Sequence, residues 1–269
     1  MYVPPRSALS KGKVAAERAI ALDDDLSDAH ATLGFVHLFY DWDWDGARRE
    51  LERAIALDPN APIAHLYYGY YLDIAGRAEE AVAEHRRALE IDPLSLILNL
   101  RYGDALQFAH RYDEAIAQYR RTHALDSSYA LLGTEIPLTY VYRGDYATAL
   151  KEFEPFSHPG KPYIGGDLIY ALARSGQRDS ARTILAALQR RARSEPVHGS
   201  ARDQEAYALV LAYLGLQMRD STLSAISQAM DERGAFIIFI ASDPLLDELR
   251  SDPRFEVLLR RAHLPVHAP

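Results

Sequence analysis

The sequence lacks cysteine, a long apolar stretch and an excess of basic charge, and each absence excludes a class of protein. Without cysteine the chain can form no disulfide, no thiolate metal site and no cysteine nucleophile. No apolar stretch approaches the roughly 18 residues of a membrane-spanning helix, so we expect no direct membrane insertion. A net charge of −8 argues against a nucleic-acid partner, because affinity for phosphates depends on Lys and Arg.

Motifs of catalysis and of metal binding are missing as well. The sequence has no Gly-x-Ser-x-Gly elbow and no His-Glu-x-x-His pair, and Gly160-Lys161 lacks the other glycines of a phosphate-binding loop. The acidic cluster Asp23–Asp25 does not have EF-hand spacing, so we expect it to cap a helix and face solvent. His30 and His65 fall at equivalent positions of a repeat, where we expect packing rather than metal binding. We therefore expect no enzyme activity, no cofactor and no metal.

A period of 34 residues dominates what the sequence does contain. Ala54–Pro59 is matched 34 residues later by Ala88–Pro93, and Gly69 and Gly103 are 34 residues apart. Glycine in a helix allows a second helix to cross closely, and an Asp-Pro pair ends a helix because proline donates no backbone hydrogen bond. One helical hairpin leaves an apolar face that the next hairpin covers. The pattern therefore predicts an all-α stack of hairpins.

With these residues the chain resembles the tetratricopeptide repeat family. The resemblance implies an all-α fold, a right-handed superhelical α-α solenoid of helical hairpins with a C-terminal capping helix. Pro137 stands at the usual glycine position of the fourth hairpin, and a proline inside a helix costs about 3 kcal/mol relative to alanine, so this helix should kink or start late. The predicted hairpins cover residues 27–61, 62–95, 96–129, 130–160, 162–195 and 203–235.

The same resemblance divides the chain into four parts. Residues 1–26 are a truncated first hairpin with only its second helix, and residues 27–160 hold hairpins one to four. Residues 161–235 hold two degenerate hairpins, and residues 236–269 form the C-terminal cap and tail. Ser251-Asp252-Pro253 predicts the start of the capping helix, since a capping side chain precedes a proline in the first turn.

Two segments resemble a narrower group of proteins. Tyr40–Asp45 and Leu249–Arg261 look like the repeat tails of bacterial signalling proteins, which follow a serine/threonine kinase, a cyclase or a winged-helix domain. This resemblance implies a sensory or protein-binding tail, although the sequence holds no kinase, cyclase or DNA-binding signature. We expect a cytoplasmic protein, with an extracytoplasmic tail of a membrane protein as the alternative.

The predicted helix Lys11–Leu22 has no partner helix before it. Ala19 and Ile20 match the positions of Ala54 and Ile55, which identifies Lys11–Leu22 as the second helix of a hairpin. Its apolar side would lack part of its cover, and full burial of one Val or Ile is worth about 1.5–3 kcal/mol. We therefore expect this face to be covered by the rest of a longer protein, by a partner, or by a second copy of the chain in a homo-oligomer.

In the resembled family the first helix of each hairpin lines a concave groove that binds a partner. The residues of this sequence at the family's contact positions are mainly aromatic, with a few charges of both signs, and aromatic residues and Arg dominate binding hot spots. Arg101 is the one strong cation at a central position, so a clamp for a C-terminal carboxylate is not expected. The candidate partner-binding residues are Phe35, Phe39, Tyr67, Tyr70, Asp73, Arg101, Asp104, Gln107, Phe108, Glu135, Tyr142, Tyr163, Tyr170 and Arg174.

From this groove we predict a non-catalytic scaffold that binds an extended peptide or a helix of a protein partner. The alternative is a small-molecule or signal-sensing regulatory tail of a larger bacterial signalling protein. The other interpretation of the groove residues is a packing role, in which some of the rings lie between repeats without touching any partner.

Overall fold

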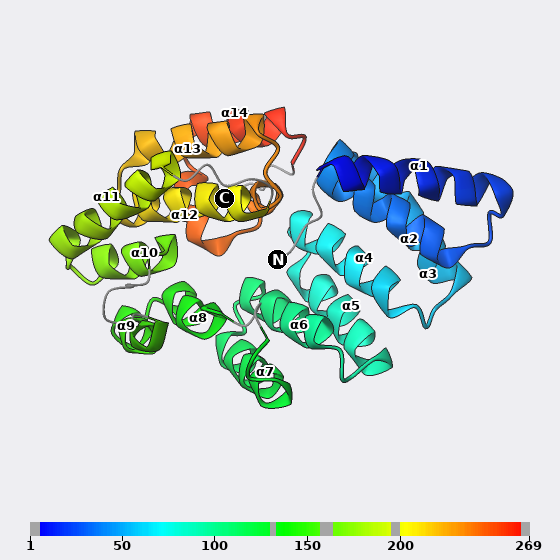
Figure 1. Cartoon of the computed structure of the whole chain (residues 1–269), viewed down its shortest axis with the longest axis horizontal. Helices are drawn as coiled ribbons and strands as arrows, with labels where there is room; N and C mark the ends of the chain where they lie inside the picture. The colour runs from blue at the N-terminus through cyan, green and yellow to red at the C-terminus, as the bar shows by residue number, and fades with distance from the viewer. Residues whose placement is uncertain (1–5, 130–132, 157–163, 195–199, 265–269) are drawn as a thin grey trace. The chain divides into compact units, whose positions relative to one another are not determined.

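The computed structural model describes four stretches of the chain, residues 6–129, 133–156, 164–194 and 200–264. Within these stretches the chain forms α-helices with a few 3-10 and π turns, and no β-strand (Figure 1). The predicted all-α class is confirmed. The chain divides into two compact units, unit 1 with residues 1–132 and 262–267, and unit 2 with residues 133–261 and 268–269.

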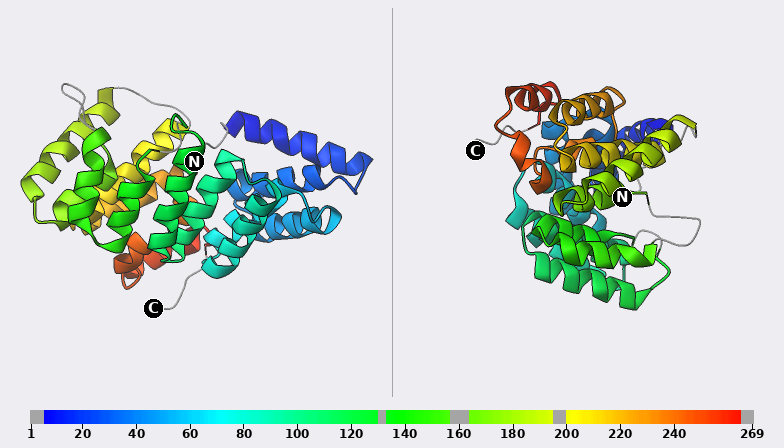
Figure 2. Two further views of the ribbon diagram at one scale, coloured as in Figure 1. Left: turned by 90° about the horizontal axis from the view of Figure 1, so that it is seen from below. Right: turned by 90° about the vertical axis from the view of Figure 1, so that its left-hand side faces the viewer.

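Unit 1 is a series of hairpins preceded by a single helix. Helix α2 packs on α3, α4 on α5 and α6 on α7, while α1 packs on α2. The first helices of the hairpins, α2, α4 and α6, contact one another in that order, and Figures 1 and 2 show the hairpins following one another from blue to green. The helices are α1 (Arg6–Leu22), α2 (Ser27–Val36), α3 (Trp44–Leu57), α4 (Pro62–Ile74), α5 (Ala78–Ile91), α6 (Leu96–Phe108) and α7 (Tyr112–Leu125), and the π turn η1 (His37–Asp41) continues α2.

Local signals set the ends of these helices. Asp43 caps the start of α3 by accepting a 2.9 Å hydrogen bond from the amide of Gly46. Helix α3 ends at Leu57, directly before Asp58-Pro59, and α5 ends at Ile91 before the second Asp-Pro pair, as predicted. Gly76 takes a positive φ of 69° after α4, a conformation that glycine adopts without strain.

Glycine is required where the two helices of a hairpin cross. A Cβ atom added to Gly69 would lie 2.6 Å from Nε2 of His85 on α5. The same addition at Gly103 would lie 2.5 Å from the ring of Tyr119, and at Gly34 it would lie 2.5 Å from Cγ of Leu51. The close crossing predicted from the 34-residue period is therefore confirmed in all three hairpins of unit 1.

Unit 2 also consists of hairpins, followed by short turns and a last helix. Helix α8 packs on α9, α10 on α11 and α12 on α13, with α10 also packing on α12 and α14 on α13. The elements are α8 (Glu135–Arg143), α9 (Tyr146–Phe153), η2 (Glu154–Phe156), α10 (Gly166–Arg174), α11 (Arg178–Ser194), α12 (Ser200–Gly215), α13 (Arg219–Asp231), η3 (Ile237–Phe239), η4 (Pro244–Leu249) and α14 (Pro253–Arg261).

Two predictions about single elements of unit 2 are confirmed. Helix α8 has nine residues where α4 and α6 have 13 each, and Pro137 is its third residue, so this helix starts late. Helix α14 begins directly after Asp252, whose Oδ1 accepts a 2.9 Å hydrogen bond from the amide of Arg254. Phe255 and Leu259 of α14 are buried, as a helix that caps a stack requires.

The division of the sequence at residues 26, 160 and 235 stays a prediction; along the chain, unit 1 gives way to unit 2 after residue 132. Among the residues that the structure describes, no helix combines the length and the apolar composition needed to cross a membrane.

Candidate functional site

Four aromatic rings of unit 1 are in mutual contact on the first helices of two neighbouring hairpins and on the π turn after α2, and we call this set the aromatic cluster. The ring centroids of Phe35 (α2) and Tyr67 (α4) are 4.5 Å apart, and those of Phe35 and Phe39 (η1) are 4.6 Å apart. Tyr70 (α4) completes the set, with its centroid 5.9 Å from that of Phe39 and 6.3 Å from that of Tyr67. Phe39 and Tyr70 are buried, whereas Phe35 and Tyr67 are half-buried. The cluster therefore has a rigid base and two partly accessible rings.

Both tyrosines of the aromatic cluster stay neutral at ordinary pH. Burial raises the pKa of the Tyr67 hydroxyl, and it raises the pKa of the Tyr70 hydroxyl strongly, with Arg101 opposing that shift. A neutral phenol presents an apolar ring and a hydroxyl that can donate and accept a hydrogen bond. The cluster can thus combine apolar contact with a polar contact at its rim.

An ion pair on α6 lies close enough to the aromatic cluster to act electrostatically on the hydroxyl of Tyr70. Arg101 donates to Oδ2 of Asp104, and the hydroxyl of Tyr119 donates to Oδ1 of the same carboxylate at 2.7 Å. Arg101 is buried and Asp104 is half-buried. Both charges act on the hydroxyl of Tyr70. Asp104 therefore accepts hydrogen bonds from two residues, and its carboxylate is held in a fixed position beside the aromatic cluster.

A second polar pair lies inside the hairpin of α4 and α5. Nε2 of His85 and Oδ2 of Asp73 are 2.9 Å apart, and the two residues are only 1% and 5% exposed. In the described part of the chain, Oδ1 of Asp73 and Nδ1 of His85 have no hydrogen-bond partner. Burial raises the pKa of Asp73, and His85 partly offsets this shift. Leu51 meets Gly34 as His85 meets Gly69, so the crossing itself does not need a polar residue.

The structure places 13 of the 14 candidate residues at two levels of exposure. Six of them pack inside the chain, which is the reading that the sequence left open for some groove residues, and a partner reaches these only through their neighbours. The buried candidates are Phe39, Tyr70, Asp73, Arg101, Gln107 and Tyr170. The half-buried candidates are Phe35, Tyr67, Asp104, Phe108, Glu135, Tyr142 and Arg174. Tyr163 lies outside the described residues.

In unit 2 three side chains of the first helices contact a later segment of the same chain. Tyr142 of α8 and Tyr207 of α12 both donate hydrogen bonds to the side chain of Asp243. Nη1 of Arg174 on α10 donates to Oε2 of Glu248 at 3.3 Å. Side chains of α8, α10 and α12 therefore contact residues 243–248, which are the N-cap of η4 and most of η4 itself.

Asp243 is the carboxyl group at the centre of this contact, and its pKa is strongly shifted. It is 2% exposed, and burial raises its pKa to about 7, against the opposing effect of hydrogen bonds from the amide of Leu245 and from Tyr142. The Leu245 amide lies 2.9 Å from Oδ1, so Asp243 also caps η4. No local pattern of the sequence points to Asp243, because the two tyrosines that donate to it lie in distant parts of the chain.

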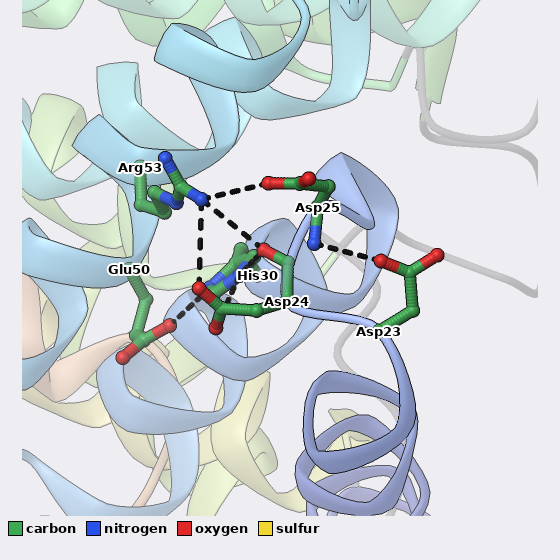
Figure 3. Close-up of polar contacts among 6 residues, drawn as sticks. All are labelled: Asp23, Asp24, Asp25, His30, Glu50 and Arg53. Atoms are coloured by element: carbon green, nitrogen blue, oxygen red, sulfur yellow. Dashed lines mark hydrogen bonds and ion pairs between the residues drawn. The ribbon is translucent and has the colours of Figure 1, made fainter.

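The two repeat-equivalent histidines join each first helix to its second helix and to the preceding turn. In the first hairpin Nδ1 of His30 lies 2.7 Å from Oε2 of Glu50, and Nε2 lies 3.0 Å from the carbonyl oxygen of Asp24 (Figure 3). In the second hairpin His65 makes the same contacts with Glu84 at 2.6 Å and with the carbonyl oxygen of Pro59 at 3.0 Å. We call each such set a histidine bridge. The predicted packing role of both histidines is confirmed.

The acidic cluster Asp23–Asp25 surrounds the first histidine bridge. The amide of Asp25 donates to Oδ1 of Asp23 at 3.0 Å, and Arg53 of α3 donates to Oδ1 of Asp25 at 3.0 Å (Figure 3). In the part of the chain that the structure describes, no three His, Asp or Glu side chains are arranged to hold a metal ion. These acidic side chains shape the turn before α2.

Comparison with known proteins identifies the fold. No model of a protein family matches the chain, and a search of curated proteins gives no significant match. Among solved structures it is similar to PilW, a widely conserved type IV pilus biogenesis factor, with a TM-score of 0.59 and 20% identity over 70% of this chain and 87% of that chain. It is also similar to a chain of the APC/C hetero-tetramer Cut9-Hcn1, with a TM-score of 0.57 and 16% identity over 94% of this chain and 46% of that chain. The fold is of the tetratricopeptide repeat type, and the narrower likeness to signalling-protein tails stays a prediction.

Proposed function

We propose that this chain is a non-catalytic interaction module that holds a protein partner, as an extended peptide or a helix, on the first helices of unit 1. The observation that carries the proposal is the aromatic cluster, in which the half-buried rings of Phe35 and Tyr67 lie on a buried base. Rings that are already packed lose little conformational entropy when a partner covers them, which is why rigid aromatic anchors dominate binding hot spots.

Polar groups at the rim supply the specificity of this surface. Asp104 is held by Arg101 and Tyr119, so it presents an acceptor in a fixed place beside the aromatic cluster. An amide or a cationic group of the partner can donate to it, while apolar side chains of the partner cover Phe35 and Tyr67. The net charge of −8 favours a neutral or basic partner segment over an acidic one.

Unit 2 supports the assignment of the partner surface to unit 1. Its first helices contact residues 243–248 of the same chain through Tyr142, Arg174 and Tyr207. Leu245 and Leu246 of this segment are buried, which anchors it. Three first-helix side chains of unit 2 are therefore already engaged by the same chain, while the half-buried rings of Phe35 and Tyr67 offer apolar surface in unit 1.

The experiment selects ligands from a displayed library of random peptides and compares variants of the whole chain. Peptides selected by the wild-type chain should bind Phe35→Ala/Tyr67→Ala at least tenfold more weakly, measured by fluorescence anisotropy. Tyr68→Ala is the matched control, because Tyr68 is another half-buried tyrosine of α4 and contacts Glu52 rather than the aromatic cluster. Circular dichroism verifies that helicity is kept. Equal affinity of the selected peptides for all three proteins would place the partner surface elsewhere.

A further inference from the structure

Three successive hairpins of unit 1 use one bridging arrangement in two chemical versions. The histidine bridges hold the first two hairpins, through His30 and His65. In the third hairpin Asn99 takes the equivalent place. Its Nδ2 donates to the carbonyl oxygen of Pro93 at 2.9 Å, and Nε2 of Gln118 donates to its Oδ1 at 2.8 Å. The third bridge therefore has the same topology with neutral amides only.

The histidine bridge requires a proton that the amide bridge does not. A glutamate carboxylate and a backbone carbonyl oxygen both accept hydrogen bonds, so both ring nitrogens of His65 must donate. Only the protonated imidazole carries two N–H donors. When the proton is lost, one ring nitrogen turns a lone pair toward an oxygen that lies 2.6 or 3.0 Å away, and one hydrogen bond is lost with it.

The charges around His65 favour its protonated form. Burial, the largest single influence, lowers the pKa of His65, but the hydrogen bonds to Glu84 and to the carbonyl of Pro59 and the charge of Glu84 together raise it above its ordinary value of 6.5, with Arg87 opposing. The stabilisation is therefore complete below the unfolded value of 6.5 and is lost as the pH rises through the folded pKa.

The first histidine bridge has the same hydrogen-bond geometry around His30. Glu50 and Arg53 come from α3, and Asp24 comes from the preceding turn, with its Oδ1 3.7 Å from Nε2 of the ring (Figure 3). Arg53 also contacts the carbonyl oxygen of Asp24, at 3.4 Å. The ring is 4% exposed, so water does not replace these contacts while the hairpin is closed.

We propose that the histidine bridge of His65 makes the second hairpin of unit 1 a proton-sensitive segment, which opens more readily as the pH rises, while the third hairpin with its amide bridge does not respond. His65 lies on α4, the helix that carries Tyr67 and Tyr70. The helix that loosens therefore positions two rings of the aromatic cluster. This device does not depend on the identity of any partner.

The test transplants the amide bridge of the third hairpin into the second. His65→Asn/Glu84→Gln copies the Asn99–Gln118 pair, and hydrogen exchange of the whole chain is followed between pH 6 and pH 9. In the wild type the protection factors of α4 and α5 should fall by up to about tenfold per pH unit as the proton is lost, while those of α6 and α7 stay constant. In the variant the α4 and α5 values should no longer fall.

Two further arms keep the test decisive if that variant does not fold. The reverse change, Asn99→His/Gln118→Glu, should give α6 and α7 a pH dependence that the wild type lacks. Nitrogen-15 NMR of the wild-type chain should show both ring nitrogens of His65 protonated at pH 6.5, with a titration midpoint above 6.5. A midpoint at or below 6.5, or a pH dependence of α4 that survives the transplant, would overturn the proposal.

Discussion

At the scale of single residues, the crossing glycines show how small a change the hairpins can tolerate. Gly69→Ala should destabilise the chain by about 1–3 kcal/mol, because the new Cβ lies 2.6 Å from the buried ring of His85 and this overpacking outweighs the roughly 1 kcal/mol by which alanine favours a helix. Gly12→Ala in α1 is the control, since the nearest atom there is 3.9 Å away, on Val36. Denaturant unfolding should show the control as neutral or stabilising, and equal loss in both variants would contradict the prediction.

The buried pair of Asp73 and His85 gives a second prediction at this scale. His85→Leu should cost about 3–5 kcal/mol, because it leaves a buried carboxyl group without its partner. Asp73→Leu/His85→Leu should cost much less, because leucine already occupies the crossing position of the first hairpin, at Leu51. The measurement is the free energy of unfolding in urea. A double variant no more stable than His85→Leu alone would show that the polar pair is required by the fold.

At the scale of elements, the contact between η4 and the first helices of unit 2 should depend on pH. Asp243 has a folded pKa of about 7 against an ordinary value of 3.8, so the folded unit holds an extra proton between these values. The stability of unit 2 should therefore fall as the pH rises from about 4 to about 7, by at most about 1.4 kcal/mol per pH unit, and level off above.

Asp243→Asn should remove this pH dependence and keep the cap of η4, because asparagine also caps well. Asp247→Asn is the matched control, an exposed aspartate of the same turn that pairs with Arg250 at 2.7 Å. Hydrogen exchange of α12 and η4 at pH 4.5, 6 and 8 gives the readout. The prediction is contradicted if Asp243→Asn keeps the wild-type slope.

Elements differ in how far the sequence alone predicts them. The ends of α3 and α5 follow from Asp-Pro pairs, and the short α8 follows from Pro137, because caps and prolines act within one turn of the chain. The contact between Tyr207 and Asp243 spans 36 positions and depends on where a 3-10 turn folds back, which no local pattern specifies. For the same reason the sequence could place Tyr70 and Arg101 on first helices but could not tell that both are buried.

At the scale of the whole molecule, a stack of repeats should respond locally to a core mutation, because each hairpin contacts mainly its neighbours. Leu51→Ala removes a side chain that is 0% exposed and should cost about 2–5 kcal/mol. Hydrogen-exchange protection should fall in α2–α5 and stay unchanged in α10 and α12. Leu246→Ala, also at a 0% exposed leucine, should give the converse pattern. A uniform loss of protection in both variants would show that the chain unfolds as one cooperative body.

The all-α class and the hairpin order were predictable at this scale because the same residue pattern recurs in successive repeats. Ala54–Pro59 and Ala88–Pro93 carry one signal twice, so a chance match to the period is improbable. The residues that bind a partner do not repeat in this way. Phe35 and Tyr67 became candidates only through a resemblance, and their shared cluster depends on packing distances that the period does not contain.

The contact of residues 243–248 with the first helices of unit 2 has a consequence for competition between ligands. Residues 243–248 are joined to α13 by a short stretch of chain, so they act as a tethered ligand whose effective concentration is on the order of millimolar or higher. A free peptide with modest affinity for Tyr142 or Arg174 would have to exceed that concentration to displace them. In a screen run at micromolar peptide we therefore expect the selected peptides to bind unit 1 and not the first helices of unit 2.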